Sequence, residues 1–237
     1  MPTKSNSRSS GFSLVELIIV VFLLSIVVGG IFSQIERAQV KYHVEDQKMD
    51  LTQQERDFID QFTRDLRQAG YPSPTQYGNR FDLSSQYTAV GVYYISPTQV
   101  SMEADVDGDG IVDEITYTFD NSAAPCPCLR RASAPKQDGV MPWNQAAANP
   151  TTPYTEVQGL VAVAGQPVFT ASDQNGSSVS LATPISLSSG SLTDSTYQLL
   201  KTIKNVGITV TTQGNKDPDG RKVIQVTMTG MARLPNN

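Results

Sequence analysis

A long apolar run near the start of the chain gives way to mixed polar and apolar residues. Residues 12–35 are mostly Leu, Ile, Val and Phe, and the polar exceptions include Glu16 and Ser25. As a helix, these 24 residues extend about 36 Å, at roughly 1.5 Å per residue, which is enough to cross the hydrocarbon core of a bilayer. The pattern therefore predicts a membrane-spanning helix over residues 12–35.

Helical character continues beyond the apolar run, because no Pro or Gly occurs between residue 31 and Gly70. Within residues 36–70, apolar side chains recur at steps of seven, four, four and three. Such spacing is typical of a helix with one apolar face, which we expect to pack against a domain core. Gly70 and Pro72 are expected to end this helix, which would run from about residue 12 to residue 69. The apolar stripe consists of Leu51, Phe58, Phe62, Leu66 and Ala69.

After residue 74 the pattern changes to short β-rich runs separated by Gly, Pro, Asn and Asp. Strands are expected at residues 87–96, 99–104, 114–120, 128–133, 156–165, 167–173, 203–213 and 222–234, with a short helix at 195–200. The last two strands alternate in period two and predict a terminal hairpin. The chain is therefore expected to be α+β, with the amphipathic helix half covering an antiparallel sheet in a head formed by residues 71–237.

Composition and charge exclude several classes of function. The formal net charge of -5 gives no indication of a nucleic-acid or anionic-membrane partner. Cys126 and Cys128, even with the single His43, are too few for a structural zinc site, and they are expected to be free or joined by a local bridge. The sequence contains no H-E-x-x-H, phosphate-loop or dinucleotide-binding motif, so no enzyme activity is predicted.

The sequence GFSLVELIIVVFLLSIV, which begins at Gly11, resembles the prepilin signature of type IV pilins and type II secretion pseudopilins. This resemblance implies that a membrane peptidase cuts between Gly11 and Phe12 and that Phe12 is then N-methylated. It also implies the pilin fold, in which a long amino-terminal helix packs on an antiparallel sheet. Residues 1–11 would be the leader peptide, kept in the cytoplasm by its Lys and Arg residues.

That cleavage also gives a chemical explanation for Glu16, which becomes the fifth residue of the mature chain. Its carboxylate lies one helical turn from the new ammonium group of Phe12. In a filament the acid would pair with the amino terminus of a neighbouring subunit, or else with its own. A discarded signal peptide, cut just before Ile31, is the alternative for this segment, although a carboxylate is costly in an apolar region.

A second resemblance, at the end of the long helix, indicates which subgroup of pilins the chain resembles. Residues 58–74, FIDQFTRDLRQAGYPSP, resemble minor pilins of the PilW type, and the pseudopilin J family is similar here. The resemblance implies a structural minor pilin of a type IV pilus that serves adhesion, motility, DNA uptake or secretion, or alternatively a type II secretion pseudopilin. Its partners would be other pilin subunits, the prepilin peptidase and an inner-membrane assembly platform, with no specific nucleic-acid contact. The head would lie in the periplasm on a single inner-membrane span before assembly and on a cell-surface filament afterwards.

An acidic stretch in the head has the spacing of calcium-binding loops. Aspartates occupy loop positions one, three, five and nine, a Gly stands at position six, and a backbone carbonyl is available at position seven. Thr116 stands at position twelve, where an EF-hand has a bidentate Glu, and the alternative is a hairpin turn with solvated charges. The expected Ca²⁺ ligands are Asp105, Asp107, Asp109, Ile111 and Asp113.

The acidic stretch leaves two further functions open. One is a membrane-anchored, calcium-dependent adhesin or binding module, which exposed aromatic side chains beside the loop would favour. The other is a secreted enzyme that uses acids such as Asp105 or Asp113. The aromatic candidates are Tyr93, Tyr94, Trp143 and Tyr154.

Overall fold

The computed structural model describes residues 13–77, 83–122, 126–139, 154–163, 165–187, 191–216 and 223–235. The chain divides into two compact units, residues 1–46 and residues 47–237. The boundary falls within the helix α1 (Leu14–Gln68), so that the last turns of this helix form part of the second unit. Gly11 and Phe12, the expected processing residues, lie outside the described residues.

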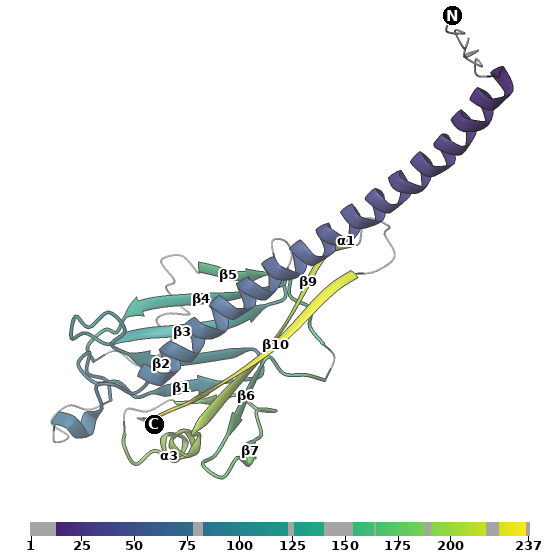
Figure 1. Ribbon diagram of the computed structural model, residues 1–237. Helices are drawn as coiled ribbons and strands as arrows, with labels where there is room; N and C mark the ends of the chain where they lie inside the picture. Colours follow the sequence, from purple (N-terminus) through teal and green to yellow (C-terminus); the bar gives the residue numbers. More distant parts are fainter. Residues whose placement is uncertain are drawn as a thin grey trace, which may run out of the picture. The chain divides into compact units, whose positions relative to one another are not determined.

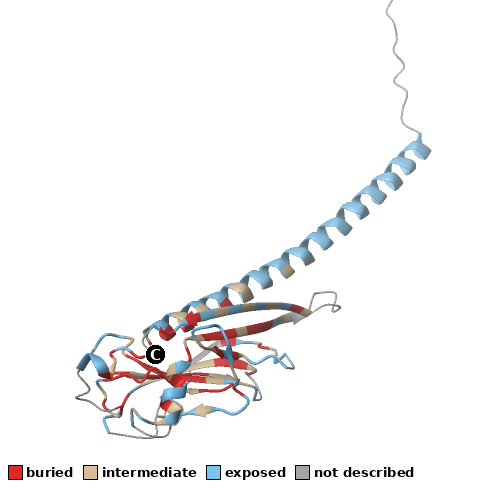
Figure 2. Cartoon of the chain, turned by 90° about the horizontal axis from the view of Figure 1, so that it is seen from below, coloured by how far each residue is buried: buried red, intermediate tan, exposed pale blue. Residues whose placement is uncertain are grey.

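In the first unit, the described residues are all helical except Ser13. The side chains of residues 14–35 are exposed, as the pale blue stretch of helix in Figure 2 shows. Within the described part of the chain, α1 is the one helix that is long and apolar enough to cross a membrane. Leu14 is 74% exposed and Phe22 is 64% exposed, so this surface finds no apolar partner within its own unit.

The second unit contains two antiparallel sheets together with the later turns of α1 (Figure 1). One sheet has the strand order β5-β4-β3-β2-β1-β8, and the other has the order β10-β9-β6-β7. The strands are β1 (Val92–Ile95), β2 (Gln99–Ala104), β3 (Asp113–Asp120), β4 (Cys128–Pro135), β5 (Tyr154–Gln158), β6 (Phe169–Ser172), β7 (Ser178–Val179), β8 (Ile185–Ser186), β9 (Asn205–Lys216) and β10 (Val223–Arg233). A 3-10 helix, η1 (Pro74–Tyr77), and a short helix, α3 (Ser195–Thr202), complete the described elements.

The core of this unit lies where α1 meets both sheets. The ring of Phe62 packs edge-on against Tyr117 of β3, with centroids 5.0 Å apart, and lies 5.7 Å from Phe169 of β6. Phe58 also meets Tyr117 edge-on. All four rings are buried, and such aromatic contacts stabilise a core beyond their buried area alone. The helix therefore holds the two sheets together.

The observed elements confirm the expected α+β class and most expected strands. Helix α1 ends at Gln68, and Gly70 follows with a φ of 79°, a conformation that favours glycine. The terminal hairpin is confirmed, since β9 and β10 pair from Asn205↔Arg233 to Lys216↔Val223. The short helix expected at residues 195–200 is also present. The stripe residues Phe58, Phe62, Leu66 and Ala69 are buried, while Leu51 is half-buried.

Three features differ from the expectation. The strands form two sheets, whereas the pattern suggested one. The strand expected at residues 156–165 ends at Gln158, because Gly159 has a φ of 70° and a side chain there would approach the backbone oxygen of Gln213. The segment between residues 174 and 194, where no strand was expected, contributes β7 and β8, which are too short to leave a periodic pattern.

Candidate functional site

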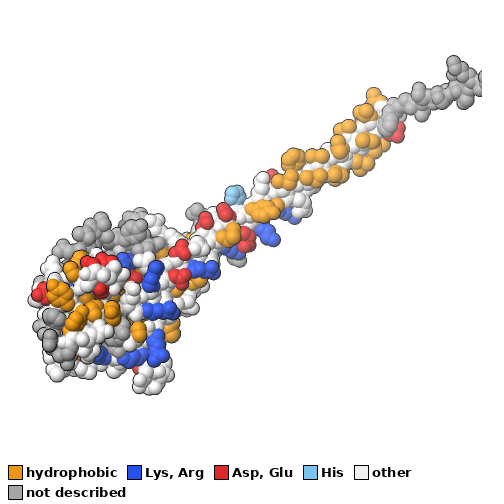
Figure 3. All heavy atoms as spheres, turned by 60° about the vertical axis from the view of Figure 1, so that its left-hand side comes forward, with side chains coloured by type: hydrophobic (Ala, Val, Ile, Leu, Met, Phe, Trp, Pro, Cys, Tyr) orange, Lys and Arg blue, Asp and Glu red, His pale blue; other side chains and the backbone are white. Residues whose placement is uncertain are grey.

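The amino-terminal part of α1 is one candidate site, because its apolar side chains have no partner within their unit. Figure 3 shows hydrophobic side chains gathered over these turns, with charged side chains of both signs further along the helix. Ser25 satisfies its hydroxyl by donating to the carbonyl oxygen of Phe22 at 2.7 Å. Its polar group therefore needs no water, as a segment that enters hydrocarbon requires.

Glu16 lies in the first turn of α1, as expected, and is exposed. The amide of Leu17 donates to the carbonyl of Ser13 at 3.2 Å, so the helical pattern is already established beside it. A carboxylate at this position is favoured by the partial positive charge of the helix amino terminus. The proposed partner of Glu16, the amino group of Phe12, lies outside the described residues.

Two acidic residues of α1, both buried, attach the helix to the head, and the apolar stripe gave no indication of either. Glu55 accepts hydrogen bonds from the backbone amide and the hydroxyl of Thr212 in β9, at 3.1 and 2.7 Å. Burial raises the pKa of Glu55, and the two hydrogen bonds from Thr212 oppose that rise. The carboxylate is thus held in the interior by a single residue of the sheet.

The second buried acid of α1 is Asp65, which follows the core residues Phe58 and Phe62 along the helix. Its Oδ2 accepts hydrogen bonds from the hydroxyl of Tyr117 at 2.6 Å and from Nε of Arg131 at 2.9 Å. Arg131 lies on β4, next to Tyr117 in the register of β3 and β4. An acid buried in this way requires a partner in the protein interior, and Tyr117 and Arg131 supply it.

The acidic loop brings three of the expected calcium ligands together. Ligand oxygens of Asp105, Asp107 and Asp109 all lie within 4.8 Å of one another. Asp105 accepts from the amides of Gly108 and Gly110 at 2.8 and 3.2 Å, and Asp109 accepts from the amide of Ile111 at 2.7 Å. These hydrogen bonds turn the carboxylates toward the centre of their own loop. A set of hard oxygen donors of this kind fits Ca²⁺.

The fourth acid of the loop, Asp113, begins β3 and is not part of that three-residue group. Burial raises its pKa to about 6, and the negative charges of Asp107, Asp109 and Asp105 contribute to the rise. Four carboxylates therefore share one small region, and their mutual repulsion would be relieved by a cation. Ile111 lies in the same loop and is half-buried.

Among the aromatic candidates that the structure describes, none presents an exposed ring beside the acidic loop. Tyr93 is buried and Tyr94 packs against the core, while Trp143 and the side chain of Tyr154 lie outside the described residues. Two other tyrosines lie close to the loop ends instead. The amide of Asp105 donates to the carbonyl of Tyr71 at 3.0 Å, and the amide of Val112 donates to the carbonyl of Gln86, the neighbour of Tyr87, at 2.9 Å. Tyr71 is 50% exposed and Tyr87 is 42% exposed.

Lys136 and Glu103 form a fully buried ion pair. Nζ of Lys136 donates to Oε2 of Glu103 at 2.8 Å and to the carbonyl oxygens of Leu83 and Thr88 at 2.7 and 2.8 Å. Burial raises the pKa of Glu103, and the charge of Lys136 opposes that rise. The three acceptors around one ammonium group fasten the segment before β1 to the sheet, which is a structural role.

Cys126 and Cys128 are joined by a disulfide bond, which selects the bridged alternative for these residues. Oδ2 of Asp120 pairs with Nη1 of Arg130 at 3.1 Å. The sulfurs of Cys126 and Cys128 and a carboxylate oxygen of Asp120 lie within 4.8 Å of one another. Because the sulfurs are bonded to each other and the carboxylate is paired with Arg130, this group is not a metal site in the oxidised protein.

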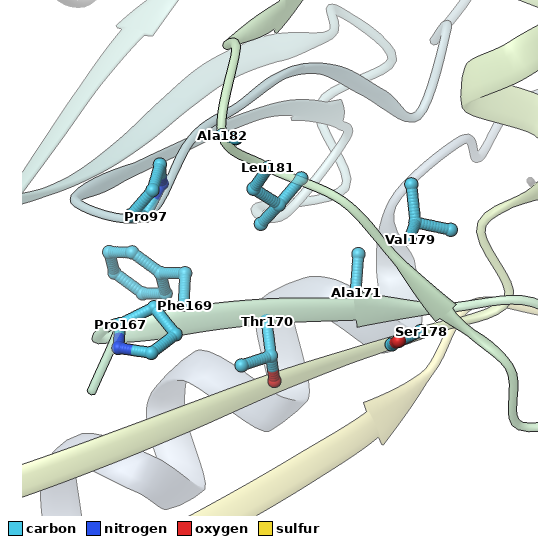
Figure 4. A pocket seen from close by; sticks show the side chains of 9 residues that line it. All are labelled: Pro97, Pro167, Phe169, Thr170, Ala171, Ser178, Val179, Leu181 and Ala182. Carbon is cyan, nitrogen blue, oxygen red and sulfur yellow. The ribbon is translucent and has the colours of Figure 1, made fainter. Parts of the chain in front are cut away.

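One pocket of about 260 Å³ lies between β6 and the chain that follows β7 (Figure 4). Its lining is mainly apolar, with hydroxyl groups from Thr170 and Ser178, and none of its lining residues is charged. It therefore offers no acid, base or metal ligand for catalysis. The lining residues are Pro97, Pro167, Phe169, Thr170, Ala171, Ser178, Val179, Leu181 and Ala182.

Comparison with known proteins identifies the amino-terminal segment. Residues 6–32 match the family model described as the prokaryotic N-terminal methylation motif. This match covers the amino-terminal segment and is consistent with the type IV pilin and pseudopilin family. No curated protein and no solved structure matches the chain.

The motif match and the fold agree. The motif indicates processing by a prepilin peptidase and assembly with other pilin-like subunits, and it ends within the exposed apolar turns of α1. The long amino-terminal helix followed by an antiparallel head is the arrangement of the pilin fold. The match does not reach the head, so it leaves the acidic loop and the disulfide unassigned.

Proposed function

We propose that this protein is a minor pilin, cleaved after Gly11, N-methylated at Phe12 and assembled into a type IV pilus or at its tip. The observation that carries the proposal is the methylation motif at residues 6–32, placed at the start of a 55-residue helix whose first turns are apolar and exposed. The resemblance of residues 58–74 to the PilW type supports a minor subunit. The chain would act structurally, without catalysis.

The assembly step follows from the charge of Glu16. Cleavage creates an ammonium group on Phe12, and two opposite charges in apolar surroundings are stable only when they are paired. Insertion of the helix among its neighbours would pair each carboxylate with a subunit's amino terminus. The partners would be other pilins and an inner-membrane assembly platform, with the head in the periplasm before assembly. A type II secretion pseudopilus is the alternative filament.

The intact mass of the membrane-extracted protein tests this proposal. We expect a chain that starts at Phe12 and carries one added methyl group. A Gly11→Val variant, in which a bulky side chain occupies the cleavage position, should retain residues 1–11 and serves as the control. A mature chain starting near Ile31 would contradict the proposal, because the apolar helix would then be a discarded signal peptide.

We further propose that the acidic loop binds Ca²⁺ through Asp105, Asp107, Asp109, Asp113 and the carbonyl of Ile111. The support is the mutual approach of three carboxylates and the raised pKa of the fourth. Calcium should raise the melting temperature of the full-length protein in detergent, and a chelator should reverse the effect. The variant Asp107→Asn should lose most of the response, whereas Asp173→Asn, in another exposed turn, should keep it. An identical melting curve with calcium and with chelator would rule the site out.

A second candidate function is calcium-dependent adhesion through this face of the head. The exposed rings of Tyr71 and Tyr87 support it. The carbonyl of Tyr71 accepts a hydrogen bond at one end of the loop, and the carbonyl of Gln86, the neighbour of Tyr87, accepts one at the other end. Aromatic rings beside bound calcium offer a stacking surface for a sugar ring. Binding to immobilised carbohydrates should then require calcium and fall in a Tyr71→Ala variant. Binding that is equal in chelator would exclude this role.

A further inference from the structure

The environment of the Cys126–Cys128 disulfide is unusual for a bridge whose purpose is stability. The bonded residues are only two apart, so the bridge restricts the unfolded chain far less than one that closes a long loop. Cys128 is already fixed by strand pairing on both sides, with Asp120 of β3 and Gln158 of β5 as its register partners. The amide of Leu160 also donates to the carbonyl of Pro127 at 3.2 Å. The backbone here is thus held without the sulfur–sulfur bond.

Arg130 directs its guanidinium group at both sulfurs. Its Nε lies 3.4 Å from Sγ of Cys128, and its Nη2 lies 3.3 Å from Sγ of Cys126. A disulfide sulfur is a weak hydrogen-bond acceptor, whereas a thiolate is a charged one. The same two contacts would therefore be much stronger after the bridge opens than they are before. A neighbouring cation lowers the pKa of a cysteine thiol, so that the thiolate forms at neutral pH.

Asp120 fixes the guanidinium in this orientation. Its Oδ2 pairs with Nη1 of Arg130 at 3.1 Å, which leaves the other nitrogens of the fork for the sulfurs. Hydrogen bonds from Ser122, together with the charge of Arg130, lower the pKa of Asp120, so the acid remains ionised at neutral pH. Arg130 is therefore held by a contact with Asp120 that does not involve the cysteines.

We propose that Cys126 and Cys128 form a thiol–disulfide exchange site, in which an incoming thiolate attacks Cys126 and Arg130 stabilises Cys128 as the departing thiolate. Cys126 is 8% exposed and Cys128 is fully buried, so attack occurs at Cys126. A bond forms between the incoming sulfur and Sγ of Cys126. The bond between the two protein sulfurs breaks, and its electron pair remains on Sγ of Cys128. One thiolate is consumed and one is produced, so charge and electrons balance.

The ligand is a thiol, either a small molecule or a protein, and the product is a mixed disulfide at Cys126. A second thiolate from the same partner can then release the partner as a disulfide and leave both cysteines reduced. The site would thus allow the head to be linked covalently, and reversibly, to a thiol-bearing molecule. This inference concerns the head alone and does not depend on the filament role.

Exchange can be measured on the folded, full-length protein in detergent. The protein is incubated with reduced glutathione near pH 7.5, quenched with an alkylating reagent and analysed by peptide mass. We expect glutathione on Cys126 and the alkyl group on Cys128, with the far-ultraviolet circular dichroism unchanged. A parallel reaction with reduced thioredoxin shows by its rate whether a small thiol or a protein thiol is the preferred source; rapid exchange with either supports the site.

Variants of Arg130 separate an exchange site from a structural bridge. Arg130→Gln should slow adduct formation on the order of tenfold, because the departing thiolate loses its cation, and Arg130→Lys should recover part of the rate. Arg64→Gln, an exposed change on α1, is the matched control and should react as the unchanged protein does. Three results would overturn the proposal: reaction only in denaturant, an adduct on Cys128 alone, or equal rates for Arg130→Gln and the control.

Discussion

The hydroxyl of Tyr117 and Nε of Arg131 donate to the same carboxylate oxygen of Asp65, at 2.6 and 2.9 Å. Tyr117 and Arg131 are register partners on adjacent strands, and Asp65 lies on the helix above them. One oxygen of α1 therefore connects to two strands of the six-stranded sheet. Since Asp65 and Tyr117 are buried, the loss of either donor leaves a charged group short of a partner.

Tyr117→Phe should lower the free energy of unfolding by about 1.5–3 kcal/mol, the range for a hydrogen bond to a charged group. The ring and its contacts with Phe58 and Phe62 are retained, so the change isolates the hydroxyl. Chemical denaturation measures the effect, and Tyr71→Phe, at an exposed position, is the control. A loss no larger than that of the control would show that the Asp65 contact adds nothing to stability.

Gly230→Ala should destabilise the head by about 1–3 kcal/mol through overpacking. A Cβ atom at this position in β10 would meet Cγ2 of Ile59 at 2.5 Å. The double variant Gly230→Ala with Ile59→Ala removes the opposing methyl group, so its loss should be smaller than the sum of the two single losses. Thr229→Ser, on the exposed side of the same strand, is the control. Strictly additive losses would contradict the close contact.

Glu55 gives the head a pH dependence of predictable sign. Its folded-state pKa is raised above the usual 4.5, so the folded protein binds more protons than the unfolded chain in the pH range between the two pKa values. This contribution to stability is present at low pH and is lost as the pH rises through the folded-state pKa. Glu55→Gln should therefore gain in melting temperature, relative to the unchanged protein, as the pH rises above about 4.5.

The comparison for Glu55 needs a control on the same helix. Asp57→Asn removes an exposed acid two residues away and should leave the pH profile unchanged. Thermal unfolding of the full-length protein in detergent, followed at a series of pH values, provides the measurement. A difference between Glu55→Gln and the unchanged protein that is constant with pH would refute the assignment.

Glu16→Ala should be inserted, cleaved and methylated normally but should be depleted from sheared filaments by at least about tenfold, because the ammonium of Phe12 would be left without a partner. Immunoblotting of membrane and filament fractions measures the distribution. Glu36→Ala, an exposed acid beyond the apolar run, should assemble normally. Equal amounts of the Glu16→Ala variant and the unchanged protein in filaments would remove the pairing from the assembly mechanism.

The periodic parts of the chain could be predicted from sequence because one physical constraint dominates each of them. The length and hydropathy of the apolar run predict a membrane-spanning helix. The helical spacing of Phe58, Phe62 and Leu66 predicts the buried face of α1. The hairpin of β9 and β10 follows from alternation on either side of a turn. In each case, neighbouring residues carry enough information to define the element.

The polar contacts could not be predicted in this way, because they join residues that are far apart in the sequence. Glu55 meets Thr212, Asp65 meets Arg131, and no local pattern records either pair. Of the aromatic candidates, Tyr93 and Tyr94 pack in the core, and the exposed Tyr71 and Tyr87 were not among the candidates. Tyr71 reaches the loop only because the chain leaving α1 hydrogen-bonds to Asp105, a relationship set by the tertiary fold.

The buried acids of α1 also determine how the head bears mechanical load. Asp65 ties the helix to β3 and β4, Glu55 ties it to β9, and the two attachments lie ten positions apart along α1. A pull along the axis of these turns loads both attachments in shear, together with the aromatic contacts of Phe58 and Phe62 between them, so the load is shared. A pull across the axis would open them one after another. The second unit is therefore expected to resist a pull along these turns of α1 better than a pull across them.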